Sequence, residues 1–306
     1  MEYQHLPVLL EEVIEWLITD ETRVFLDCTL GEGGHSQEIL RRFPAVTVYG
    51  LDRDGAILDK ARNRLSIFQD RIFTFQKNFR DISADLFKDV QFDAVLIDLG
   101  ISVYHYKESG RGFSFLKREK LDMRLDHEAM SVFDIINQFS EREIAEILWK
   151  YGDERFSRKI ASRIIKARSD GTIEYSDQLA EIISAAIPVK FHPKHVHPAT
   201  KSFQALRIFS NTELDNIKEG IPKVISMIKK GGRLGVITFH SLEDRIVKNL
   251  LRDLSKDCVC PPGTPVCICG KKSIVKILSR AVKATEEEVK NNPPSRSAQL
   301  RVVEKL

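Results

Sequence analysis

The chain has 306 residues and a formal net charge of +3, with 42% hydrophobic and 30% charged residues and a mean hydropathy of −0.22. No apolar run approaches the ~18–20 residues that a membrane-spanning helix needs. The first residues, MEYQHLPVLLEEVIEWL, carry acidic side chains where a signal peptide has basic ones, and five cysteines do not make a disulfide framework in a chain of this length. We therefore expect a cytoplasmic protein with one large domain or two smaller ones.

The first hundred residues alternate between short apolar runs and segments with helical spacing. Runs that are apolar nearly throughout are typical of parallel strands, which are buried on both faces. Strands are expected at residues 24–29, 46–52, 71–76 and 92–100, and helices at residues 36–43 and 56–68. This order predicts an α/β fold with a mostly parallel, doubly wound sheet.

A block of helical patterns interrupts the sheet pattern after residue 100. Helices are expected at residues 131–139, 140–151, 154–168 and 176–187, and Ser140 with Glu143 has the pattern of a capping box. A helix at 212–228 and a strand at 231–239 resume the sheet, and residues 276–282 and 298–304 are expected to pair as antiparallel edge strands. We predict a discontinuous domain of residues 1–112 and 207–306, and an inserted helical domain for substrate recognition at residues 113–206.

Three glycines lie between the first strand and the first helix, in the sequence DCTLGEGGHSQEIL. Gly31, Gly33 and Gly34 allow the close approach of another molecule at the carboxyl end of the strand. Asp52 ends the next strand, about 20 residues further on, where a carboxylate can hold two ribose hydroxyls. The alternative is that these glycines only form a tight turn between strand and helix.

Three classes of ligand suit such a loop to different degrees. A nucleoside triphosphate is not expected, because the loop lacks the G-x-x-x-x-G-K-[ST] pattern. NAD fits less well, since the G-x-G-x-x-G pattern requires a glycine where this chain has Ser36. S-adenosylmethionine has an adenosine and an amino acid tail but no phosphate, and it suits both the glycines and Asp52.

Asp98 ends the fourth strand, in the sequence VLIDLG, and faces the same edge of the sheet. There a carboxylate can accept an N–H from an exocyclic amine and orient its lone pair toward a methyl donor. The alternative is a structural aspartate that caps the next turn. Methylation at carbon 5 of a pyrimidine needs a cysteine nucleophile, and Cys28 lies on the first strand instead, so a nitrogen or oxygen acceptor is favoured.

Five motifs occur in order along nearly the whole chain. They are LDCTLGEGGHS, DLGIS…RGFSF…LDMRLD, HPATKSFQALRIFSNTEL, GGRLGVITFHSLEDRIVK and NPPSRSAQLRVVE. Together they closely resemble the MraW family of bacterial 16S ribosomal RNA methyltransferases. The resemblance implies a class I methyltransferase fold with an inserted helical domain. It also implies methyl transfer from S-adenosylmethionine to N4 of a cytidine in the decoding region of 16S rRNA, within the small ribosomal subunit.

The resemblance also implies which residues contact the cofactor. Carried over residue by residue, they are Gly33, Gly34, His35, Asp52, Phe79, Asp98 and His105. The Phe79 ring is expected to cover adenine, with ordinary core packing as the alternative. The family usually has SSPQLD where this chain reads SVYHYK, so His105 takes the place of a glutamine contact, and LKREKLDMR lacks the usual Asp-Gly-Pro.

Basic and aromatic side chains supply candidate contacts to RNA. The helix around residues 155–166 is expected to carry one basic stripe beside an apolar one, with a solvated helix face as the alternative. RGFSF offers two rings for stacking on an extruded cytosine, and the segments at 190–201 and after 239 add further contacts, the latter with loop hydrogen bonding as its alternative. The predicted substrate contacts are Arg111, Phe113, Phe115, Arg155, Lys159, Arg163, Lys166, His197, Lys201 and His240.

Four cysteines in CVCPPGTPVCIC have two interpretations. They form either a small zinc knuckle or a reduced, cysteine-rich loop, and their C-x-C spacing is narrower than the usual C-x-x-C of zinc sites. His192, His195 and His197 lack a nearby cysteine or acid to complete a tetrahedral set. We assign no metal ligand from the sequence.

The sequence thus predicts a cytoplasmic, S-adenosylmethionine-dependent rRNA (cytosine-N4)-methyltransferase that acts on the small subunit as a monomer or a homodimer. An NAD-dependent oxidoreductase on the same fold is disfavoured by Ser36. A non-catalytic RNA-binding protein is disfavoured by the complete set of Gly33, His35, Asp52 and Asp98. A DNA amino-methyltransferase usually carries an acid-Pro-Pro-aromatic motif where this chain reads DLGI.

Overall fold

The computed structural model describes residues 6–261, 266 and 268–306. The chain divides into two compact units: the first comprises residues 1–101 and 214–306, and the second residues 102–213. The second unit starts before and ends after the segment 113–206 that we expected to be inserted. It includes the helix that follows Ser102 and the end of the helix at residues 200–210, because both hydrogen-bond within this unit, through Arg207 to Tyr106 for example.

The first unit is built on one eight-stranded sheet in the order β3-β2-β1-β4-β5-β8-β6, with β7 also paired to β8. The strands are β1 Val24–Asp27, β2 Thr47–Asp52, β3 Ile72–Gln76, β4 Phe92–Asp98, β5 Ile228–Thr238, β6 Val275–Ile277, β7 Val282–Lys283 and β8 Gln299–Lys305. Strands β1 to β5 pair in parallel, and β6 and β7 pair antiparallel with β8. The predicted α/β fold with a mostly parallel sheet is confirmed.

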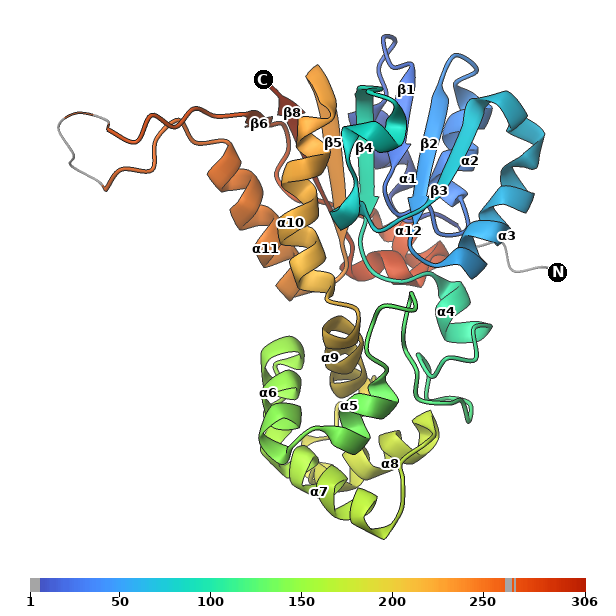
Figure 1. Cartoon of the computed structure of the whole chain (residues 1–306), viewed down its shortest axis with the longest axis vertical. Helices are drawn as coiled ribbons and strands as arrows, with labels where there is room; N and C mark the ends of the chain where they lie inside the picture. Colours follow the sequence, from blue (N-terminus) through green and yellow to red (C-terminus); the bar gives the residue numbers. More distant parts are fainter. Residues whose placement is uncertain (1–5, 262–265, 267) are drawn as a thin grey trace. The chain divides into compact units, whose positions relative to one another are not determined.

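Helices cover both faces of this sheet (Figure 1). They are α1 Leu10–Leu17, α2 Gly34–Arg42, α3 Gly55–Leu65, α10 Glu213–Ser226, α11 Ser241–Leu254 and α12 Glu286–Asn291. Alternate residues of β4 supply two cores: Val95 and Ile97 pack with α10 and α11, whereas Ala94 and Leu96 pack with α1, α2 and α3. This two-sided burial explains why the strands read as continuous apolar runs.

The second unit is helical. Its helices are α4 Val103–Lys107, α5 Val132–Gln138, α6 Glu141–Gly152, α7 Ser157–Asp170, α8 Ser176–Ala186 and α9 Thr200–Ser210. The capping box predicted at the start of α6 is confirmed, because Ser140 and Glu143 each accept a backbone N–H from the other residue. In the part of the chain that the structure describes, no helix combines the length and apolar content needed to cross a membrane.

Candidate functional site

Three neighbouring parallel strands of the first unit each end in an aspartate. Asp27 ends β1, Asp52 ends β2 and Asp98 ends β4, and β1 lies between the other two strands. The carboxyl ends of parallel strands meet at one edge of a sheet, where open α/β folds bind their ligands. The sheet order therefore gathers three acidic side chains beside the glycine loop.

At two positions of the glycine loop, the backbone conformation requires glycine. Gly31 and Gly33 have φ values of 54° and 80°, in the left-handed region that side chains with a Cβ rarely adopt. A Cβ on Gly33 would also lie 2.9 Å from Leu65 Cδ1. Gly34 begins α2, and a Cβ there would lie 3.5 Å from Pro7, an ordinary contact distance.

Asp52 is tied to this loop. Its Oδ2 accepts the Gly31 N–H at 2.9 Å, and its Oδ1 accepts the Asp54 N–H at 2.9 Å. Asp52 thus stands at the strand end where open α/β folds hold ribose hydroxyls, and its contact with a ribose stays a prediction. The loop and the predicted ribose-binding residue are thus held in one hydrogen-bonded arrangement.

Asp27 and Ser36 form a buried pair beneath the loop. The Ser36 hydroxyl donates to Asp27 Oδ2 at 2.7 Å, and the two residues are 0% and 2% exposed. Burial raises the pKa of Asp27 to about 6, against the lowering effect of the Ser36 hydrogen bond. Ser36 therefore has a partner of its own at the position where a dinucleotide fingerprint has its third glycine.

Asp98 has one oxygen without a partner. Its backbone N–H donates to Thr29 Oγ1 at 2.7 Å, which joins the ends of β1 and β4. The side chain is 24% exposed, but Oδ1 is buried and has no hydrogen-bond partner among the described residues. Burial raises the pKa of Asp98 well above its usual value, and the charges of Asp27 and Glu243 raise it further. An unpartnered buried acceptor is costly unless a ligand uses it.

His35 lies next to Asp98 at the start of α2. It is 6% exposed, and its Nδ1 lies 3.8 Å from Asp98 Oδ2. Its Nε2 is 2.9 Å from the Val8 carbonyl oxygen, an acceptor, so Nε2 is the donor and carries the hydrogen. Nδ1 then faces Asp98 as an acceptor in the neutral ring, so the ring orientation leaves a proton-accepting face toward the carboxyl group.

The site has an excess of acidic groups over basic ones among the described residues. Among the described residues, neither Asp27 nor Asp98 forms an ion pair with a lysine or arginine, and the buried Glu243 adds a third acid near them. Buried carboxylates without a cation are stabilised by a positively charged ligand. The sulfonium and ammonium groups of S-adenosylmethionine are such charges, so these residues fit that cofactor better than a phosphate-bearing one.

His240 serves the start of α11. The Glu243 N–H donates to its Nδ1 at 3.4 Å, and its Nε2 lies 3.1 Å from Glu243 Oε1. Glu243 in turn accepts the Phe239 N–H at 2.9 Å. This reciprocal capping corresponds to the alternative of loop hydrogen bonding, and the contact between His240 and the substrate stays a prediction.

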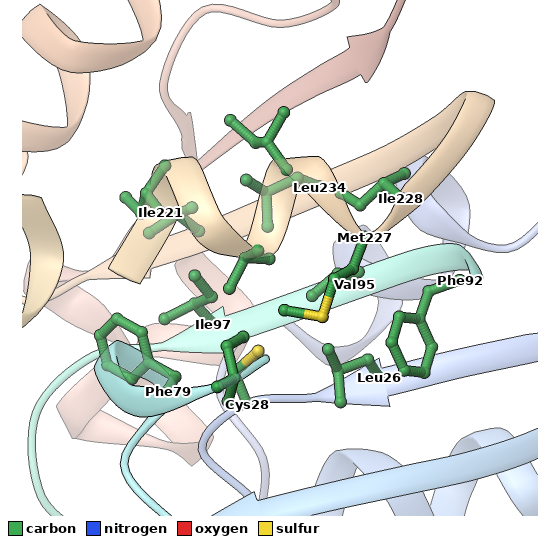
Figure 2. Packing of buried hydrophobic residues seen from close by; sticks show 14 of the residues in the cluster. Leu26, Cys28, Phe79, Phe92, Val95, Ile97, Ile221, Met227, Ile228 and Leu234 are labelled. Carbon is green, nitrogen blue, oxygen red and sulfur yellow. The ribbon is translucent and has the colours of Figure 1, made fainter. Parts of the chain in front are cut away.

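Phe79 lies in the core of the first unit. It begins the 3-10 helix Phe79–Asp81 after β3, is 8% exposed and belongs to the cluster that packs against α10. Figure 2 shows it beside Ile97 and Ile221, at the opposite end of the cluster from Phe92. A Cβ on Gly220 would come within 2.4 Å of its ring. This is the core packing named as the alternative, and contact between the ring and adenine stays a prediction.

Within the second unit, the structure brings His105, Phe113 and Arg111 together. His105 is buried in α4, and its ring lies 5.3 Å from the ring of Phe113, which is only 4% exposed. The Arg111 guanidinium lies 5.7 Å from the same ring and donates to the Arg124 carbonyl at 2.8 Å. Phe113 is thus enclosed by its own unit and presents little surface for stacking on a base.

Phe115 and His197 form a second aromatic pair in this unit. Their ring centroids are 4.6 Å apart, and Phe115 also contacts Phe203 at 4.9 Å. Phe115 is half-buried and His197 is exposed, so this pair presents ring surface to solvent. Burial and the neighbouring His192 lower the pKa of His197. Lys201 is exposed nearby in sequence, at the start of α9.

The predicted basic stripe is only partly on one helix. Lys159, Arg163 and Lys166 lie on α7 and are exposed, beside the buried Ile160. The prediction that Arg155 belongs to this helix is wrong, because α7 begins at Ser157 and residue 155 lies in the preceding turn. Burial of Ser157 and the turn that Glu154 caps by accepting the Phe156 N–H fix this later start.

The predictions from the sequence did not include three residues of the site. Asp27 and Glu243 are buried acids whose charges act on Asp98, and Thr29 holds the Asp98 backbone. Asp27 follows an apolar run as Asp52 and Asp98 do, so the same signal identifies it. Of the four clustered cysteines, Cys267 lies outside the described residues.

Comparison with known proteins shows which family the chain resembles over its whole length. The sequence model of the MraW methylase family matches residues 2–306. A protein of Treponema denticola named ribosomal RNA small subunit methyltransferase H is 46% identical over 314 residues, which cover 100% of this chain and 98% of that protein. A protein of the same name from Brevibacillus brevis is 43% identical over 312 residues, which cover 100% of this chain and 99% of that protein. The resemblance seen in the motifs is confirmed, and the chain belongs to the MraW methylase family.

Proposed function

We propose that this chain is an S-adenosylmethionine-dependent methyltransferase that methylates the exocyclic N4 of a cytidine in the decoding region of 16S rRNA, within the small ribosomal subunit. Membership of the MraW methylase family and the names of its relatives support the reaction and the substrate. The observation that carries the proposal in the structure is the buried, unpartnered Oδ1 of Asp98 beside the glycine loop. A ribosomal substrate places the reaction in the cytoplasm.

Different residues around the glycine loop bind different parts of the cofactor. Asp52 holds the ribose hydroxyls, and the turn at Gly31 and Gly33 admits the amino acid end, because a Cβ on Gly31 would meet only the Thr29 carbonyl within 4 Å. The acids Asp27 and Asp98 stabilise positive charge at the centre of the site. S-adenosylmethionine supplies, when bound, a methyl group on a positively charged sulfur with a neutral leaving group.

Asp98 positions the amine and removes its proton. Its Oδ1 accepts one N–H of the cytosine amine, which directs the nitrogen lone pair toward the methyl group. A cation in the site opposes the effect of burial and keeps Asp98 ionised before transfer. Methyl transfer moves the positive charge from the sulfur to the amine nitrogen and leaves a neutral thioether. The nitrogen then passes its N–H proton to Asp98, which makes both groups neutral, and burial favours the neutral form of the carboxyl group.

The helical second unit is the candidate substrate-recognition domain. Its exposed cations on α7 suit RNA phosphates, and the solvent-facing pair of Phe115 and His197 suits stacking on an unpaired base. A base must leave its stack before N4 can reach a methyl donor. All groups invoked in the first unit come from one chain, so both a monomer and a homodimer satisfy the proposal.

Titration calorimetry of the purified chain tests the cofactor and the role of Asp98 together. We expect saturable binding of S-adenosylmethionine, no binding of NAD, and proton release on binding, because burial raises the pKa of Asp98 and the cofactor's positive charge favours its ionised form. The Asp98→Asn variant should bind with less proton release. Binding of NAD in place of S-adenosylmethionine would contradict the proposal, as would binding without any proton release.

A further inference from the structure

The segment between α11 and β6 carries a cluster of thiols that the methyl-transfer site does not use. Its two ends are joined, because Ile274 N–H donates to the Leu254 carbonyl at 3.0 Å and Asp257 Oδ1 accepts from both the N–H and the hydroxyl of Ser273, at 3.0 and 2.7 Å. Cys258, Cys260 and Cys269 lie beyond this closed base. The base thus brings cysteines from both arms of the segment to one place.

The three sulfur atoms have the spacing of ligands around one metal ion. All three lie within 4.8 Å of one another, and the Sγ atoms of Cys258 and Cys269 are 3.8 Å apart. Zinc–sulfur bonds of about 2.3 Å in a tetrahedral arrangement place two sulfurs about 3.8 Å apart. A disulfide needs about 2.05 Å, so the separation matches shared coordination and not an S–S bond.

Backbone N–H groups also point at these sulfurs. The Cys260 N–H donates to Cys258 Sγ at 3.3 Å, and the Val259 N–H donates to Cys269 Sγ at 3.5 Å. Such hydrogen bonds stabilise a thiolate over a thiol, and thiolates are the form that binds metal. The short turn at Cys258–Cys260 therefore supplies both ligands and the donors that orient them.

We propose that Cys258, Cys260 and Cys269 bind a structural Zn²⁺ ion. Thiolates are soft ligands that select zinc over Mg²⁺ and Ca²⁺, which prefer oxygen. Three sulfurs within reach of one another favour a single ion over an iron–sulfur cluster, which distributes its thiolates over several irons. The site is separate from the glycine loop and does not rest on the proposed function.

The described apolar side chains of the segment are exposed. Val259, Val266 and Ile268 are 56%, 71% and 85% exposed, so these three side chains are not part of a core. A short excursion without a core gains order from a metal ion, whose binding free energy becomes folding free energy. We infer that zinc fixes this segment locally, while the core of the first unit is formed without it.

Metal analysis of the whole purified protein, prepared with a reductant and added zinc, tests the site. We expect about one zinc per chain after gel filtration. Cys258→Ser and Cys269→Ser should each lose most of this zinc and keep the circular dichroism of the parent. Cys28→Ala is the matched control, because Cys28 is buried in the core of the first unit and should not affect zinc content (Figure 2).

Cobalt substitution provides a second measurement that does not depend on the variants. Replacement by Co²⁺ should produce the intense visible d–d bands and thiolate charge-transfer absorption of a tetrahedral sulfur site. Three results would overturn the proposal: zinc content equal in the parent and in Cys258→Ser, a Cys258–Cys269 disulfide in protein kept under reductant, or iron with acid-labile sulfide in place of zinc.

Discussion

Asp98 and Asp27 are buried acids whose protonation depends on what occupies the site. Burial raises both pKa values; the charge of Asp27 raises the pKa of Asp98 further, and the charge of Asp52 raises that of Asp27. A structural aspartate that only capped a turn would have its oxygens satisfied, whereas Asp98 Oδ1 is buried without a partner among the described residues. Burial of this unpartnered oxygen costs free energy, which is typical of a side chain that takes part in binding or catalysis.

Replacing Asp98 by asparagine should separate chemistry from folding. The amide keeps the shape but accepts no proton, so we expect kcat to fall by about 10²–10⁴-fold with a smaller change in the KM for S-adenosylmethionine. Single-turnover transfer to small subunits measures this. Asp93→Asn, at the amino end of the same strand, should retain turnover per folded molecule, and parental turnover in Asp98→Asn would remove Asp98 from the mechanism.

Asp27 should make folding stability depend on pH. Its pKa rises from 3.8 to about 6 on folding, so the folded state holds the proton more tightly than the unfolded state. The stability this provides is fully present below pH 3.8 and is lost as the pH rises through about 6, at a cost of about 3 kcal/mol when complete. Asp27→Asn can still accept from Ser36 and avoids this cost.

The free energy of unfolding of Asp27→Asn, relative to the parent, should therefore increase between pH 4 and 7 and then level off. Urea titrations monitored by circular dichroism at several pH values measure this difference. A difference that stays constant across this range would show that Asp27 does not titrate as its burial implies.

At the scale of elements, two glycines in the turn from β1 into α2 are expected to serve different purposes. One allows a left-handed backbone conformation, and the other contacts the cofactor. Gly33→Ala should destabilise the protein by about 1–2 kcal/mol or more, because its φ of 80° is left-handed and its Cβ would crowd Leu65. Gly34→Ala should leave stability nearly unchanged, because its Cβ would lie an ordinary 3.5 Å from Pro7, and should weaken cofactor binding, because Gly34 is a predicted cofactor contact. Thermal unfolding and calorimetry on both variants measure the two effects, and equal loss of stability in both would contradict this division.

The basic face of α7 should contribute affinity for RNA through phosphate charge. We expect the triple variant Lys159→Ala, Arg163→Ala and Lys166→Ala to bind small subunits more weakly, with the slope of log K against log salt reduced by about 2 to 3. The kcat on saturating subunits should change little, since these residues lie on a helix of the second unit.

A control with the same loss of charge distinguishes phosphate contacts from net charge. Arg41, Arg62 and Lys218 are exposed cations of the first unit, each paired with an acid on its own helix. Their replacement by alanine should leave the salt slope nearly unchanged. The same slope in the two triple variants would show that α7 is only a solvated face.

The elements themselves were largely predictable because each left a local signal. Continuous apolar runs identified β1 to β5, and Ser140 with Glu143 identified the start of α6. Asp52 and Asp98 were found for the same reason, since parallel strands must present the acids at their carboxyl ends at one edge, whereas Asp27 was missed although it follows an apolar run too. The start of α7 was not predicted, because Glu154 accepts the Phe156 N–H in the turn before the helix, and the apolar periodicity continues through that turn.

The sequence could not indicate which side chains contact each other once the chain has folded. Ser36 reads as a missing glycine until its bond with Asp27 is seen, and the packing of Phe79 against Gly220 is not visible along the chain. His240 likewise pairs with Glu243 to cap α11. These roles depend on residues brought together by the fold and not on spacing along the chain.

At the scale of the whole molecule, the net charge of the protein contributes little to the recognition of one cytidine. A net charge of +3 provides little general attraction to nucleic acid. Under the proposed function, selection of one cytidine would rest on local cations and on the surface of an assembled subunit, whose folded rRNA presents the base. We expect small subunits to be better substrates than naked 16S rRNA, and comparable rates on both would place recognition in the RNA sequence alone.

The central claim is that this fold transfers a methyl group to N4 of one cytidine, and nucleoside mass spectrometry tests it most directly. Small subunits that lack the modification would be incubated with the purified protein and isotope-labelled S-adenosylmethionine, then digested and mapped. The account predicts labelled N4-methylcytidine at a single site in the decoding region, and none with Asp98→Asn. Label on carbon 5, on another base, or on no nucleoside while the cofactor is bound would contradict it.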